Sequence, residues 1–105
     1  VWDNLVFVSG QLAPKPDGTH TADDPFEVQA RQALENLKAI LESAGSSLDH
    51  VLKTTVYIVD VANWPKLNAI YADVFGDHKP ARSVVPVPNL HHGYLIEIEA
   101  IAVRK

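Results

Sequence analysis

One arginine and two glutamates have the side-chain types and the spacing in this sequence that could bind a substrate and transfer a proton. Arg82 lies near the start of one expected strand, and Glu97 and Glu99 lie on the next strand. A planar guanidinium can hold a carboxylate through two parallel hydrogen bonds, and a nearby glutamate can take or give a proton. Together they outline a small reaction centre, although arginines and glutamates on strands are most often solvated or paired at the surface.

Other polar combinations are weaker candidates. Glu97 and Glu99 share one strand face about 7 Å apart, a separation that an inverting glycosidase can use. So small a chain shows no sugar cleft, and Glu99 is better interpreted as an interface ion-pair residue. His91 and His92 are adjacent on an expected turn without a third ligand, so we predict no metal site. Ser9 has no partners in the order or spacing of a catalytic triad.

Apolar strand patterns alternate with helical patterns along the chain. The predicted elements are a strand at 5–8, a helix at 25–44, a strand at 51–59, a helix at 64–75, and strands at 81–87 and 94–103. Asp24 and Asn63 are the expected N-caps of the two helices, and Gly45 and Gly76 mark their expected ends. Pro86 and Pro88 cannot donate hydrogen bonds to a neighbouring strand, so the third strand should lie at an edge or end irregularly.

Two strand–helix–strand units with right-handed crossovers place both helices on one face of a single sheet. The other face then carries a half-apolar surface that no helix covers. Its expected members are Leu95, Glu97, Glu99, Ile101 and Val103 from the last strand and Val51, Thr55, Tyr57 and Val59 from the central strand. Because a monomer rarely leaves such a patch open, we expect this face to pack against another copy in a symmetric homo-oligomer.

Composition narrows the possible functions. The 105 residues fit one domain, and about half of them are apolar. The net charge is −4 without a cluster of basic residues, which argues against nucleic-acid binding. The chain has no cysteine, so disulfides and thiol catalysis are excluded, and a reducing cytoplasm is a compatible location. No apolar run approaches the roughly 18 residues that span a bilayer, so we expect no membrane partner.

Several blocks of this sequence resemble, in order, those of the RidA family, also called the YjgF family. They are Val-Ser-Gly-Gln at 8–11, Gln-Ala-Arg-Gln-Ala-Leu-Glu-Asn-Leu at 29–37, Ala-Gly at 44–45, Val-Leu-Lys-Thr-Thr-Val-Tyr at 51–57, Asn-Ala-Ile-Tyr at 68–71, Pro-Ala-Arg-Ser at 80–83 and Ile-Glu-Ile-Glu-Ala-Ile-Ala at 96–102. The resemblance covers essentially the whole chain. It implies an α+β, chorismate-mutase-like fold that forms homotrimers, with clefts between subunits and no cofactor.

The resemblance also implies an activity. Family members with this arginine typically hydrolyse reactive enamines and imines, such as 2-aminoacrylate, to 2-oxo acids and ammonia, a form of metabolite damage control. Arg82 matches the arginine that grips the substrate carboxylate, and Glu97 matches the glutamate associated with the attacking water. Ser9 and Gly10 match residues that line the pocket.

Three further features of the resemblance bear on the site. Asn68 matches a recurrent asparagine that we interpret as structural support. Val84 stands where many members carry cysteine, and its backbone N–H could still bind a carboxylate oxygen. The family's usual N-terminal Gly-Pro-Tyr segment, whose tyrosine contacts ligand, does not occur in this sequence, so we expect residues 1–105 to form a single RidA-like domain without it.

Three alternative functions stay open. The closest is deamination of a bulkier enamine such as an aminomuconate. A non-catalytic module that binds small carboxylates or regulates a partner is the second, because Arg82 alone would serve that role. The third is the ribonuclease or translation-inhibitor activity attached to this family, which the acidic charge disfavours.

Overall fold

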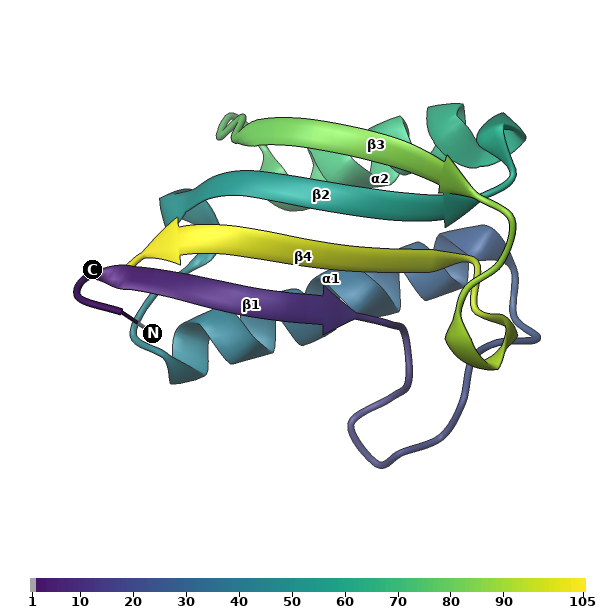
Figure 1. Ribbon diagram of the computed structural model, residues 1–105, viewed down its shortest axis with the longest axis horizontal. Helices are drawn as coiled ribbons and strands as arrows, with labels where there is room; N and C mark the ends of the chain where they lie inside the picture. Colours follow the sequence, from purple (N-terminus) through teal and green to yellow (C-terminus); the bar gives the residue numbers. More distant parts are fainter. Residues whose placement is uncertain (1) are drawn as a thin grey trace.

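Alternating apolar and polar residues build one four-stranded sheet with two helices behind it (Figure 1). The computed structural model describes residues 2–105. Its main elements are β1 (Leu5–Gln11), α1 (Phe26–Ser43), β2 (Val51–Val59), α2 (Trp64–Phe75), β3 (Ala81–Val87) and β4 (Ile96–Val103). The strand order is β1–β4–β2–β3, with β2 and β3 parallel and β4 antiparallel to both β1 and β2. The predicted α+β fold and the placement of both helices on one face are confirmed.

The core lies between the sheet and the two helices. The helical side of β4 contributes Ile96, Ile98, Ala100 and Ala102, all of which are buried. Leu34, Leu37 and Leu41 of α1 are buried against them, as the helical spacing predicts.

No helix within residues 2–105 is long and apolar enough to cross a membrane. The sheet face opposite the helices is uncovered in the single chain (Figure 1).

Three details of the predicted strands are wrong. The last strand begins at Ile96 instead of at 94. The first strand runs through Ser9 and Gly10 to Gln11 instead of ending at Val8. Val51 is buried on the helical side rather than on the open face. A register shift between Val51 and Lys53 explains this, because one extra residue reverses the side-chain alternation at the start of β2.

The start of α1 also differs from the prediction. Pro25 occupies the N-cap position and makes no side-chain capping hydrogen bond. The backbone carbonyl of Asp24 instead accepts a hydrogen bond from Gln29 Nε2 at 3.0 Å. The Gln29 side chain is buried, and its Oε1 accepts a hydrogen bond from the backbone N–H of Leu95 at 2.8 Å. Gln29 therefore ties the start of the helix to the segment that enters β4.

The α1 face gives a direct test of the core. Leu37 has no exposed surface, so Leu37→Ala should lower the free energy of unfolding by about 2–5 kcal/mol. Val28 lies on the same helix with 45% of its surface exposed. Val28→Ala should change the free energy of unfolding by about 0.5 kcal/mol or less. Urea unfolding followed by circular dichroism measures both. Equal losses for the two variants would mean that the buried face of α1 is assigned incorrectly.

Candidate active site in two halves

The Glu97 side chain stands on the open face of β4, between β1 and β2. Tyr57 of β2 lies opposite Glu97 in the antiparallel register. On the other side the Glu97 carboxylate contacts Gly10 of β1 so closely that a Cβ built on Gly10 would lie 2.7 Å from Glu97 Cδ. Ser9 and Gly10 are exposed beside it. The structure therefore brings together three of the predicted site residues, namely Ser9, Gly10 and Glu97.

Glu99 stands two residues further along the same face. The Tyr57 hydroxyl donates a long hydrogen bond of 3.5 Å to Glu99 Oε1. The negative charge of Glu99, more than partial burial or the charge of Glu97, raises the pKa of Tyr57 above its ordinary value. The Tyr57 hydroxyl is therefore protonated at neutral pH and is available as a donor. The expected role of Glu99 is in an ion pair at an interface with another subunit. The contact with Tyr57 lies within one chain and does not test this role, which stays a prediction.

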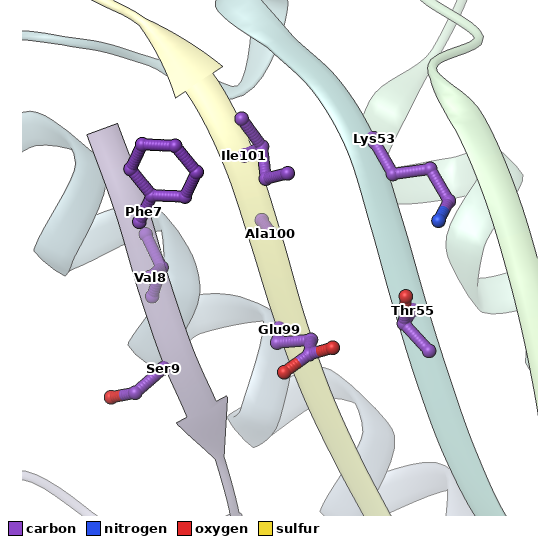
Figure 2. Close-up of a pocket in the computed structure, with 8 residues that line it drawn as sticks. All are labelled: Phe7, Val8, Ser9, Lys53, Thr55, Glu99, Ala100 and Ile101. Carbon is purple, nitrogen blue, oxygen red and sulfur yellow. The ribbon is translucent and has the colours of Figure 1, made fainter. Parts of the chain in front are cut away.

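The open face is hollowed next to these residues. A cavity of about 420 Å³ is lined by Phe7, Val8, Ser9, Lys53, Thr55, Glu99, Ala100 and Ile101. Figure 2 shows their arrangement, with the Glu99 carboxylate over β4, and with Lys53 and Thr55 on the adjacent β2. Phe7 is 55% exposed at the apolar end of the hollow. A concave, half-apolar surface with a few polar groups is typical of a surface that a ligand or another chain covers.

Arg82 lies on the opposite side of the sheet. It is paired in register with Thr54, which is fully buried toward the helices. The Arg82 guanidinium donates a hydrogen bond from Nη2 to Asn68 Oδ1 at 2.9 Å. Its Cζ lies 4.8 Å from the centre of the Tyr71 ring, which is a cation–π contact. The expected support from Asn68 is thus visible as a direct contact with the arginine.

Tyr71 was not among the predicted site residues. The signal was present in the sequence, because residues three apart on a helix share a face, so Asn68 and Tyr71 of α2 must approach the same neighbour. Burial raises the pKa of Tyr71 above its ordinary value. Its hydroxyl lies 2.8 Å from Thr54 Oγ1, which fixes the ring beneath the guanidinium.

A second cavity of about 280 Å³ surrounds Arg82. It is lined by Asn68, Tyr71, Ala72, Phe75, Gly76, His78, Lys79, Pro80 and Arg82. Arg82 and Lys79 are the cationic groups of this lining, whereas Ala72 and Phe75 are apolar. The lining is therefore suited to a small anion that carries an apolar group.

The two halves do not meet within one chain. Arg82 faces the helices on the edge strand β3, whereas Glu97 faces away from them on β4, with β2 between the two strands. The Val84 side chain is also on the helical side, half-buried against the core. A small substrate held by Arg82 cannot reach Glu97 of the same copy, because the sheet lies between them.

Fold and site define a small α+β protein with an uncovered sheet face, a carboxylate on that face and a braced arginine on the edge strand. A family model described as Endoribonuclease L-PSP matches residues 1–104. The chain belongs to this family, which includes the RidA and YjgF proteins.

Known relatives match nearly the whole chain. A RutC family protein of Pyrococcus horikoshii is 46% identical over 102 residues, which is 97% of this chain and 81% of the relative. The 2-iminobutanoate/2-iminopropanoate deaminase of Salmonella typhimurium is 44% identical over 105 residues, with 97% of this chain and 81% of the relative covered. The crystal structure of the YjgF gene product of E. coli has a TM-score of 0.91 at 40% identity, covering 100% of this chain and 84% of that one.

Proposed function

We propose that this protein hydrolyses the C=N bond of small 2-imino acids, which arise from enamines such as 2-aminoacrylate, to give 2-oxo acids and ammonia. The observation that carries the proposal is Arg82, which is braced by Asn68 and Tyr71 beside a partly apolar cavity. A braced guanidinium is suited to a planar carboxylate. The relative from Salmonella typhimurium that is named as a 2-iminobutanoate/2-iminopropanoate deaminase supports this choice of substrate.

The proposal requires a second copy of the chain. The open face leaves Phe7, Thr55 and Ile101 partly or largely exposed, and burial of such a surface stabilises an oligomer. We propose a homotrimer in which Arg82 and the Val84 backbone of one subunit face Ser9, Gly10 and Glu97 of the next. The active site is then completed between subunits, which explains why its halves are separate in one chain.

The chemistry follows from these roles. Tautomerisation moves a proton to the enamine carbon and gives the imine. Arg82 holds the carboxylate and so orients the electrophilic C2. Glu97 accepts a proton from water as the water oxygen bonds to C2, and it passes this proton to the imine nitrogen, which gives a carbinolamine. Glu97 then accepts the proton of the new hydroxyl and passes it to the amino group as the C=O bond forms and the C–N bond breaks. Ammonia leaves and the 2-oxo acid remains, so the reaction balances with substrate and water alone. The cysteine-free chain is compatible with this damage-control role in a reducing cytoplasm.

A coupled assay tests the function. A PLP-dependent dehydratase generates 2-aminoacrylate from serine, and pyruvate formation is followed with and without this protein. We expect acceleration above the spontaneous rate that grows with protein concentration. Binding of 2-oxobutyrate without acceleration would replace the proposal with the non-catalytic carboxylate-binding module. Acceleration only with an aminomuconate would instead assign the bulkier substrate.

The family description makes RNA cleavage the second candidate function. The chain has a net charge of −4, and phosphate neutralisation dominates nucleic-acid affinity. We therefore propose that RNA is not a partner. Incubation with end-labelled RNA should leave it intact at protein concentrations that saturate the deaminase assay. Cleavage that survives repurification and is lost in Arg82→Ala would overturn this choice.

The oligomer is tested by mass. Light scattering at micromolar concentration should give three times the 11.5 kDa mass of the chain. Phe7→Glu places a charge on the open face and should shift the mass toward the monomer, because burying an unpaired charge is costly. Val28→Glu, on an exposed position of α1, is the matched control and should leave the mass unchanged. A monomeric wild type would contradict the shared site.

A further inference from the structure

We propose that Gly10 is a positioning residue for Glu97, because its missing side chain leaves the space in which the Glu97 carboxylate lies. The proposal rests on the proposed catalytic role of Glu97. It assigns to Gly10 a task beyond lining the pocket, namely to set where the proton-transfer group stands.

The strand register brings Gly10 to this place. Val8 pairs with Ala100 and Gln11 pairs with Ile98, so three steps along β1 match two steps along β4. One extra residue is therefore accommodated at Ser9 and Gly10, as in a β-bulge. Bulges bend a strand and re-aim its side chains, and they occur often beside active sites. Here the irregular segment lies against the carboxylate of Glu97.

The contact is with the whole carboxylate group. A Cβ on Gly10 would lie 2.7 Å from Glu97 Cδ and 3.0 Å from each of its two oxygens. Such distances are well below ordinary van der Waals contact, which is about 3.5–4.0 Å between carbon atoms. The carboxylate thus lies directly against the Gly10 backbone, and any side chain there would displace it.

Gly10 differs in this respect from the other glycines. Gly18, Gly45, Gly76 and Gly93 all have positive φ angles, and a Cβ on each of them would meet nothing within 4 Å. Those four glycines serve backbone conformation. Gly10 has no positive φ, so its requirement is for space and not for conformation. Gly10→Ala should therefore fold normally and move only the carboxylate.

The expected consequence is a loss of turnover. A catalytic group misplaced by about 1 Å can lower the rate by about 10²-fold. Gly10→Ala should therefore reduce kcat for imine hydrolysis by about 10²-fold, with the melting temperature and the oligomeric mass unchanged. The KM should change little, because Arg82 still holds the substrate carboxylate.

A double-mutant cycle separates positioning from a general structural role. In the Glu97→Gln background, Gly10→Ala should cause little further loss, because the group that it displaces no longer transfers protons. In the Arg82→Lys background, Gly10→Ala should again cause its full loss in kcat, because Arg82 acts on the substrate independently of Glu97. Full activity of Gly10→Ala, or an equal loss in both backgrounds, would overturn the proposal.

A readout without turnover distinguishes this proposal from the proposed function. Carbon-13 NMR of the side-chain carboxyl groups should show a changed Glu97 shift in Gly10→Ala, with the Glu99 shift nearly constant. If the wild type fails to accelerate hydrolysis but the Glu97 signal moves, the proposed function is wrong and the positioning contact holds. If the Glu97 signal does not move, the positioning contact is wrong whatever the activity.

Discussion

Glu97→Gln should lower kcat for imine hydrolysis by about 10²–10⁴-fold. Glutamine keeps the shape of the side chain against Gly10 but cannot accept a proton from water. Binding of 2-oxobutyrate, measured by calorimetry, should change little because Arg82 and Asn68 are intact. The coupled pyruvate assay under substrate saturation measures the loss in kcat.

Glu99→Gln is the matched control for this prediction. Glu99 lies on the same strand and the same open face, and its contact within the chain is the Tyr57 hydroxyl. We expect its kcat to stay within about tenfold of wild type, since general acid–base catalysis requires a group within reach of the transferred proton. Equal losses in kcat for the two variants would mean that Glu97 has no catalytic role that Glu99 lacks. Unchanged turnover in Glu97→Gln would mean that Glu97 takes no part in the mechanism.

Arg82→Ala should abolish measurable binding of 2-oxobutyrate and lower kcat/KM by about 10²–10⁴-fold, as expected for the loss of two charge-assisted hydrogen bonds of about 1.5–3 kcal/mol each. Arg82→Lys should not restore activity and should still lose at least about tenfold. Lysine keeps the charge but offers no planar fork for two carboxylate oxygens, and it cannot place a planar guanidinium over the Tyr71 ring. Calorimetry and the coupled assay measure both variants.

Arg31 provides the arginine control. Arg31 forms an exposed ion pair with Asp73, 2.9 Å from Nη1 to Oδ2, which joins α1 to α2 outside both cavities. Exposed pairs of this kind stabilise a protein by about 1 kcal/mol or less, so Arg31→Ala should keep full activity. The oligomeric mass should be the same for all these variants. Full activity of Arg82→Ala would show that the proposed substrate site is wrong.

Local patterns in the sequence were sufficient for most of the architecture. Apolar periodicity placed α1 and α2, because a helix must bury its apolar stripe. Alternation on β4 assigned Glu97 and Glu99 to the face away from the helices, which the buried neighbours Ile96 and Ile98 confirm. Pro86 and Pro88 favoured an edge position or an irregular end for β3, and the structure has β3 at a sheet edge. These features depend on a few neighbouring residues, so they can be read without the fold.

Errors arose where non-local pairing overrides local pattern. The extra residues in β1 and β2 depend on the register with β4, and a register shift reverses which face a side chain joins. Val51 was placed on the wrong face for this reason. The capping role of Asp24 was also wrong, because the helix start is held by Gln29, whose partners lie on distant segments.

The candidate site divides in the same way. The sequence by itself determined the residue types that could bind a carboxylate and move a proton, and the resemblance to a family assigned roles to Arg82, Glu97, Ser9, Gly10 and Asn68. Only the tertiary structure decided that Tyr71 lies beneath Arg82, that Glu97 lies against Gly10, and that these two halves face opposite sides of the sheet. The physical reason is that strand order and register are set by packing across the whole chain, which no local pattern of residues contains.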